Sequence, residues 1–144
     1  MDYRKLADLL FPDVTDTPAE VEARYPARNL PEGAKVTRFA PSPTGFVHLG
    51  GLYGATIDER LAHQSGGVVY LRIEDTDLLR SKQEYTDSIL ASMRWLGLDW
   101  DGPLNYQTQR TELYNSYVDK LLETGHAYWC SCTPEEVEAM REKA

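Results

Sequence analysis

Two short stretches rich in β-branched and aromatic residues flank a helical stripe, and this order constrains the fold most. Residues 36–40 (VTRFA) and 68–73 (VVYLRI) have the composition of strands. Between them, residues 52–64 carry apolar side chains at helical spacing, and a glycine pair at 66–67 ends the segment. The order strand, helix, strand predicts a crossover unit and therefore a parallel sheet.

The loop after the first strand carries residues suited to an anion. Residues 38–51 read RFAPSPTGFVHLGG. Arg38 offers a planar fork that matches a carboxylate, and Ser42 is held between two prolines that fix its backbone. Alternatively, Arg38 is a surface charge on a strand edge and Ser42 is an ordinary turn residue.

The end of this loop is expected to open a helix. Unpaired backbone N–H groups at a helix N-terminus bind phosphate, and Gly50 and Gly51 would let a phosphate approach closely. His48 could donate to a phosphoryl oxygen. The alternative is a tight turn whose glycines serve packing and whose histidine is solvated.

Three carboxylates follow the second strand, at residues 74–77 (EDTD). Ligands of parallel sheets gather at the carboxyl ends of strands, where this segment and the first loop should both lie. We expect Arg72, Arg80, a substrate ammonium or a metal to compensate the negative charge. Glu74 is predicted to face away from Ile73, toward a cleft, although a solvated acidic loop is the alternative.

The flanking segments are predicted to be mostly helical. Residues 1–35 form a helical extension, with a capping box at 17–20, and packing without chemistry is its favoured role. Amphipathic helices are expected over 82–96 and 110–124, a short strand or extended piece over 127–132, and a capped helix from residue 133.

Two cysteines and three tryptophans complete the set of notable residues. Cys130 and Cys132 lie too close for an easy mutual disulfide and supply at most half of a tetrahedral zinc site. Free, buried thiols are the favoured state, so no metal is assigned. Trp95, Trp100 and Trp129 are expected to anchor the core and the loops.

Composition indicates a folded, cytoplasmic protein of one domain. The chain has 144 residues, 42% of them hydrophobic, with no apolar run near the ~20 residues of a membrane span and no secretory leader pattern. A net charge of −8 argues against a nucleic-acid platform as a whole, but not against a local basic site. Only two convincing strands are visible, so the chain has the content of the front half of a larger sheet.

Three segments together resemble the start of glutamyl-tRNA synthetases: residues 38–51, 71–77 (LRIEDTD) and 95–102 (WLGLDWDG). The resemblance runs from about residue 36 to the C-terminus. It implies an α/β fold, the front half of a Rossmann-type parallel-sheet catalytic domain of class I aminoacyl-tRNA synthetases. The implied division is a helical extension over 1–35 and a partial catalytic domain over 36–144, which runs into the start of an insertion.

The resemblance also implies roles in binding glutamate. Arg38 would bind the side-chain carboxylate with help from Ser42. Glu74 would hold the α-ammonium, and Ala40 would approach the substrate through its backbone.

A second set of roles concerns ATP and tRNA. His48, Gly50 and Gly51 would bind ATP and support the charge on its α-phosphate, which makes them the catalytic residues. Asp77 would lie near the 3′ end of the tRNA.

The implied activity is that of a glutamate–tRNA ligase, with L-glutamate, ATP accompanied by Mg²⁺, and tRNA(Glu) as partners, and no membrane. The sequence has no counterpart of the family's Lys-Met-Ser-Lys-Ser signature, its anticodon-binding region or the second ligand pair of its zinc insertion. The isolated chain is therefore expected to be inactive or very weak, and to self-associate through an exposed apolar face. The alternatives are a non-catalytic nucleotide-binding or interaction module, and the tRNA-modifying glutamyl-Q paralogue.

Overall fold

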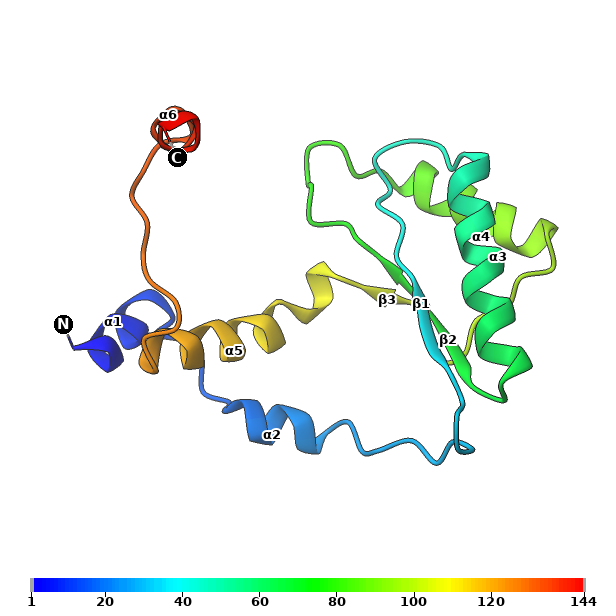
Figure 1. Cartoon of the computed structure of the whole chain (residues 1–144), viewed down its shortest axis with the longest axis horizontal. Helices are drawn as coiled ribbons and strands as arrows, with labels where there is room; N and C mark the ends of the chain where they lie inside the picture. Colours follow the sequence, from blue (N-terminus) through cyan, green and yellow to red (C-terminus); the bar gives the residue numbers. More distant parts are fainter. Residues whose placement is uncertain (1, 144) are drawn as a thin grey trace. The chain divides into compact units, whose positions relative to one another are not determined.

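The computed structural model describes residues 2–143, which form a parallel sheet and helices in an α/β arrangement (Figure 1). In chain order the elements are α1 (Tyr3–Leu10), α2 (Pro18–Ala23), β1 (Val36–Phe39), α3 (Leu49–Gln64), β2 (Val68–Ile73), α4 (Gln83–Trp95), β3 (Asn105–Tyr106), the 3₁₀ turn η1 (Thr108–Arg110), α5 (Thr111–Glu123) and α6 (Pro134–Lys143). They divide into two compact units, residues 25–112 and residues 1–24 with 113–144.

The sheet lies in the first unit and has the strand order β1-β2-β3, with both pairings parallel. Val36 pairs with Val68 and Phe39 with Leu71, so the predicted crossover unit is confirmed. The third strand was not predicted, because residues 105–106 were assigned to no element. Its two residues form a strand only through pairing with Arg72 and Ile73, which no local sequence pattern announces.

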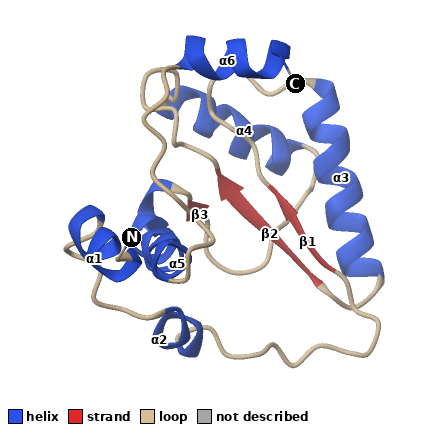
Figure 2. Ribbon diagram, turned by 60° about the vertical axis from the view of Figure 1, so that its left-hand side comes forward, coloured by secondary structure: helices blue, strands red, loops and turns tan. Residues whose placement is uncertain are grey.

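One face of the sheet carries the hydrophobic core (Figure 2). Strand β2 alternates strictly, with Val69, Leu71 and Ile73 buried and the intervening residues half-buried. Helices α3 and α4 supply Ala55, Ile89 and Met93 to the core, and Leu98, which follows α4, completes it. Period-two alternation against two helices therefore orients the opposite face of β2 away from the core.

Helix α3 begins one turn earlier than the sequence analysis expected. It starts at Leu49, with His48 as its N-cap, so Gly50 and Gly51 lie in the first helical turn instead of preceding it. Glycine is a poor helix former, and its presence made the true start difficult to recognise. The backbone N–H groups of both glycines thus belong to the helix terminus itself.

The turn from α3 into β2 needs glycine for steric reasons. Gly66 has a positive φ of 70°. A Cβ on Gly67 would lie 1.9 Å from the carbonyl oxygen of Lys35, which accepts a hydrogen bond from Val68 at 3.1 Å. The close approach of two backbones here fixes where β2 starts relative to β1.

The end of α3 is also tied to the strands by side chains. His63 contacts Glu59 Oε1 at 2.8 Å and Asp101 Oδ2 at 3.1 Å. Asp101 Oδ2 accepts a further bond from the Val69 N–H at 2.8 Å. Hydrogen bonds to both carboxylates, that to Asp101 first, raise the pKa of His63.

The second unit is helical and combines the N-terminal helices with α5 and α6. The predicted capping box is present: the Thr17 hydroxyl accepts from the Glu20 N–H, and the Glu20 carboxylate accepts from the Thr17 N–H. Tyr117 donates to Glu22 at 2.7 Å, so α5 is bonded to α2. The division into 1–35 and 36–144 stays a prediction.

Several expectations about residues 95–132 are wrong. Cys130 and Cys132 are exposed rather than buried, and residues 127–132 form no strand, which leaves the extended piece as the form expected of them. Trp95 and Trp129 are 84% and 66% exposed and anchor nothing within the described residues, whereas Trp100 does pack against the core. Within residues 2–143, no helix combines the length and apolar character needed to cross a membrane.

Candidate functional site

The ends of two neighbouring strands bring together a carboxylate and two guanidinium groups. Arg38 lies on β1, Arg72 lies on β2, and Glu74 follows β2 immediately. Arg38 Nη1 lies 3.2 Å from Glu74 Oε1, and Arg72 Nη2 donates to the same oxygen. The side chain of Glu74 is 30% exposed, so this ion pair borders solvent. The expectation that arginine compensates the charge of this segment is confirmed for Glu74.

This arrangement keeps Glu74 ionised. The hydrogen bond from Arg72 is the main cause that lowers the pKa of Glu74, and Arg38 adds to it, while burial works in the opposite direction. Both arginines bond to Oε1, and the second oxygen, Oε2, accepts no hydrogen bond from residues 2–143. An ionised carboxylate with one bonded and one accessible oxygen can accept an ammonium group.

The proline-rich loop is bonded to the segment that follows β2. The Glu74 N–H donates to Pro41 O at 2.9 Å, and the Lys82 N–H donates to Pro43 O at 3.0 Å. Ala40 is half-buried and Ser42 is exposed between these two anchors. The anchored loop therefore holds Ala40 and Ser42 at the carboxyl end of the sheet, beside Glu74.

His48 is positioned by the helix that it caps. Its Nδ1 accepts a hydrogen bond from the Gly51 N–H at 3.3 Å, which requires the proton of a neutral ring to sit on Nε2. Nε2 can then donate to an anion. A Cβ at Gly50 would lie 3.2 Å from the imidazole, so only glycine leaves the ring undisturbed.

A cavity of about 330 Å³ lies beside this helix N-terminus. Its lining brings Ser42, His48 and Gly51 together; the other residues are Phe39, Pro41, Thr44, Gly45, Phe46, Val47 and Ile89. Arg38 and Glu74 do not line it. The structure thus separates the predicted residues into a helix-terminus group and an ion-pair group, both at the ends of β1 and β2.

Two carboxylates near Glu74 are engaged elsewhere. Asp77 Oδ2 accepts from Arg80 Nε at 2.6 Å, and the hydrogen bonds from Arg80 lower the pKa of Asp77. Asp75 accepts from both the backbone and the hydroxyl of Thr108, at 2.9 and 2.6 Å. Asp75 is thereby a structural link from β2 to η1, a role that sequence reasoning missed.

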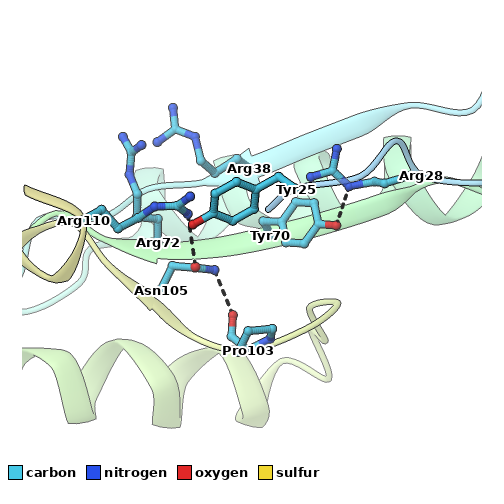
Figure 3. Close-up of a pocket in the computed structure, with 8 residues that line it drawn as sticks. All are labelled: Tyr25, Arg28, Arg38, Tyr70, Arg72, Pro103, Asn105 and Arg110. Carbon is cyan, nitrogen blue, oxygen red and sulfur yellow. Dashed lines mark hydrogen bonds between the residues drawn. The ribbon is translucent and has the colours of Figure 1, made fainter. Parts of the chain in front are cut away.

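A second cavity of about 330 Å³ lies on the face of the sheet opposite the core, and sequence reasoning missed it entirely (Figure 3). We call it the arginine-lined cavity; its residues are Tyr25, Arg28, Arg38, Tyr70, Arg72, Pro103, Asn105 and Arg110. Tyr70 and Arg72 alternate with buried residues of β2, which is the one sequence signal that pointed to this face.

The cysteines supply no metal centre with other described residues. Within residues 2–143 no three histidine, cysteine or acidic side chains are grouped so that they could hold a metal ion. Cys130 and Cys132 are neighbours, and the hydrogen bond between them raises the pKa of Cys132.

Comparisons with known proteins identify the family of the chain. Residues 35–144 match the family described as tRNA synthetases class I (E and Q), catalytic domain. A glutamate–tRNA ligase from Nitratidesulfovibrio vulgaris is 68% identical over 109 residues, which are 76% of this chain and 24% of that protein. One from Acetivibrio thermocellus is 49% identical over 156 residues, which cover 99% of this chain and 28% of the relative.

A comparison with solved structures also finds similarity to glutamate–tRNA ligases. The crystal structure of a glutamate tRNA ligase from Elizabethkingia meningosepticum, in complex with its amino acid, superposes with a TM-score of 0.66 at 38% identity. The match covers 75% of this chain and 23% of that one. The chain spans about a quarter of the length of the curated relatives. It belongs to the class I tRNA synthetase family of the glutamate and glutamine group, through the catalytic domain that its residues 35–144 match.

Proposed function

We propose that this chain provides the glutamate- and ATP-recognition part of a glutamate–tRNA ligase. The observation that carries the proposal is the ion pair between Arg38 and Glu74 at the carboxyl ends of adjacent parallel strands, with the His48-capped terminus of α3 at the same edge. One cation, one anion and one phosphate-binding helix terminus match the side-chain carboxylate and the ammonium group of glutamate and the phosphates of ATP.

On glutamate binding, the substrate carboxylate would replace the Glu74 carboxylate as the partner of Arg38. Arg38 is bonded to Glu74 in the absence of substrate, 3.2 Å away. The side-chain carboxylate of glutamate would take a place on Arg38, with Ser42 and the backbone of Ala40 beside it. Arg72 would keep Glu74 ionised and oriented, so that Glu74 can receive the substrate ammonium.

ATP would occupy the region around His48, Gly50 and Gly51. The Gly50 N–H would donate to a phosphate there, whereas the Gly51 N–H is bonded to His48 Nδ1 and so orients the ring. Nε2 of His48 would donate to an oxygen whose charge grows as the adenylate forms. The α-carboxylate of glutamate would attack the α-phosphorus of ATP, and pyrophosphate would leave. No covalent enzyme intermediate is required. Mg²⁺ would accompany the ATP phosphates.

Transfer to tRNA(Glu) completes the proposed reaction, with Asp77 near the tRNA 3′ end. Cys130 and Cys132 are not proposed as zinc ligands, because two thiols are half of a tetrahedral set. Self-association is proposed through α3, where Leu49, Tyr53 and Leu61 are 82%, 67% and 52% exposed at helical spacing.

The test is glutamate-dependent ATP–pyrophosphate exchange, measured together with L-glutamate and ATP binding. We expect very weak exchange that requires L-glutamate and is lost in both Arg38→Ala and His48→Ala. Arg38→Ala should abolish glutamate binding and His48→Ala should weaken ATP binding, while Arg60→Ala, on an exposed part of α3, should change neither. Exchange that survives both substitutions, or an unaltered chain that binds neither ligand, would refute the proposal.

A further inference from the structure

The arginine-lined cavity collects positive charge in an otherwise acidic chain. The net charge of the protein is −8, yet four of the eight residues that line this cavity are arginines and none is acidic. Arg38 and Arg72 both form ion pairs with Glu74, and Asp58 also attracts Arg38 electrostatically. Clustered guanidinium groups repel one another unless an anion lies between them.

Two of the four arginines have no acidic partner at all within residues 2–143. Arg28 Nε donates to the Tyr70 hydroxyl at 2.7 Å, and Arg110 Nη1 donates to Asn105 Oδ1 at 3.4 Å. Both acceptors are neutral. The charges of Arg28 and Arg110 are therefore uncompensated by the part of the chain that the structure describes.

Aromatic rings hold these two guanidinium groups in place. Arg28 lies 4.8 Å from the ring centroid of Tyr70, and Arg110 lies 5.2 Å from that of Tyr25. Figure 3 shows the two arginines entering from opposite ends of the cavity, with both tyrosines between them. A guanidinium stacked on a ring loses little further freedom on binding, and its N–H edges stay available.

A buried donor in the same cavity also lacks a partner. Nε of Arg72 is inaccessible to solvent and forms no hydrogen bond, although Nη2 of the same group bonds to Glu74. An unpaired buried donor is costly, and a small shift of the Arg72 side chain that brought Nε to a ligand oxygen would remove this cost.

From these observations we infer that the arginine-lined cavity binds a compact, multiply charged phosphoanion. Arginine forks match phosphate oxygens bidentately, and the charges of Arg28 and Arg110 are an excess of two that a singly charged ligand would not neutralise. A cavity of about 330 Å³ accommodates a pyrophosphate group or a small nucleotide.

This site is separate from the proposed ATP site. The helix-terminus cavity at His48 and the arginine-lined cavity share no residue. Tyr25 and Arg28 also precede residue 35, where the family match begins, so part of the site comes from outside the matched catalytic domain. The cavity shares Arg38 with the proposed glutamate site, but the two uncompensated charges that carry the inference, those of Arg28 and Arg110, have no part in the proposed function.

The test uses the 144-residue chain, with ¹⁵N-labelled arginine side chains, and inorganic pyrophosphate. We expect the Nε–H signals of Arg28, Arg72 and Arg110 to shift together and saturably, while that of Arg94 on α4 stays unchanged. Because these shifts are measured on the unaltered chain, the test remains valid even if a substituted variant folds poorly. Absence of saturable shifts, or equal shifts at Arg94, would overturn the inference.

Substitutions then measure the contribution of the uncompensated arginines. Arg28→Gln combined with Arg110→Gln should weaken pyrophosphate binding at least about tenfold and leave L-glutamate binding unchanged, whereas Arg94→Gln should change either affinity less than about twofold. Equal losses in the double variant and the Arg94 control would mean non-specific charge attraction and would refute the site.

A titration with AMP distinguishes the two sources of the phosphoanion. Tighter binding of AMP than of pyrophosphate assigns a nucleotide, and weaker binding assigns a free polyphosphate. Either result supports the inference, and failure of both ligands to bind contradicts it.

Discussion

The two faces of strand β2 differ in what they do for the molecule. One face carries Val69, Leu71 and Ile73, which are fully or almost fully buried against α3 and α4. The other carries Tyr70 and Arg72, which line a charged cavity, and leads directly to Glu74. A single strand thus separates buried core side chains from cavity-lining side chains by alternation alone.

From this comparison we expect substitutions on the two faces of β2 to affect different properties of the protein. Changes on the apolar face should lower stability strongly, because they leave a cavity in the core. Changes on the charged face should alter ligand binding and the pH dependence of stability, with small effects on folding at neutral pH.

The largest effect is expected for Leu71→Ala. Leu71 is completely buried, and removal of such a side chain should lower the free energy of unfolding by about 2–5 kcal/mol. Chemical denaturation measures the change, with Leu79→Ala as a control because Leu79 is 95% exposed. Similar losses of unfolding free energy in the two variants would contradict the assignment of the core to this face of β2.

Gly67→Ala should have the next largest effect, because it disturbs both faces. The new methyl group would meet the Lys35 carbonyl at 1.9 Å, and backbone must move to relieve the overlap. We expect a loss of about 1–3 kcal/mol in chemical denaturation. Gly54→Ala on α3 is the matched control, since nothing lies within 4 Å of its added Cβ. A Gly67→Ala protein as stable as the control would contradict the close approach of the two backbones.

Glu74→Gln, a change on the charged side of the sheet, should lower stability by an amount that depends on pH. The folded pKa of Glu74 lies below its unfolded value, so its contribution is present above the unfolded pKa of about 4.3 and disappears as pH falls through the folded value. The variant should be less stable at neutral pH by about 1 kcal/mol or less, and the difference should vanish in acid. Denaturation curves at several pH values test this, and a difference that grows on acidification would contradict the sign.

His63→Gln should give the smallest effect, with the opposite pH dependence. The folded pKa of His63 is raised, so its stabilisation is complete below the unfolded pKa of about 6.5 and is lost as pH rises through the folded value. Because the side chain is 36% exposed, we expect about 0.5 kcal/mol or less at pH 5.5. Thermal unfolding at pH 5.5 and pH 9 measures it, and a larger loss at pH 9 would be inconsistent.

Local sequence patterns predicted the parts of the fold that local physics determines. The β-branched alternation of 68–73, the glycine pair at 66–67 and the capping box at 17–20 led to confirmed elements. Strand β3 escaped prediction because pairing with β2 alone makes residues 105–106 a strand. The start of α3 was missed because His48 serves as its cap, an unusual choice for that position.

In the candidate site, too, some residues could be predicted from local sequence and others could not. Contiguous motifs pointed to Arg38, His48 and Glu74, and the structure places all three at the strand ends. The roles assigned to them remain proposals. Arg28 and Arg110 were invisible from the sequence, because they lie 82 positions apart and only the fold brings them to one cavity.

The exchange of carboxylates on Arg38 is the central claim, and an NMR titration with L-glutamate tests it most directly. The measurement follows Nε–H of Arg38 and the ¹³C signal of the Glu74 carboxyl in the same sample. The account predicts that both signals shift together and saturate at the same L-glutamate concentration, with D-glutamate and L-glutamine much weaker. Saturable binding that leaves the Arg38 and Glu74 signals unmoved would contradict it.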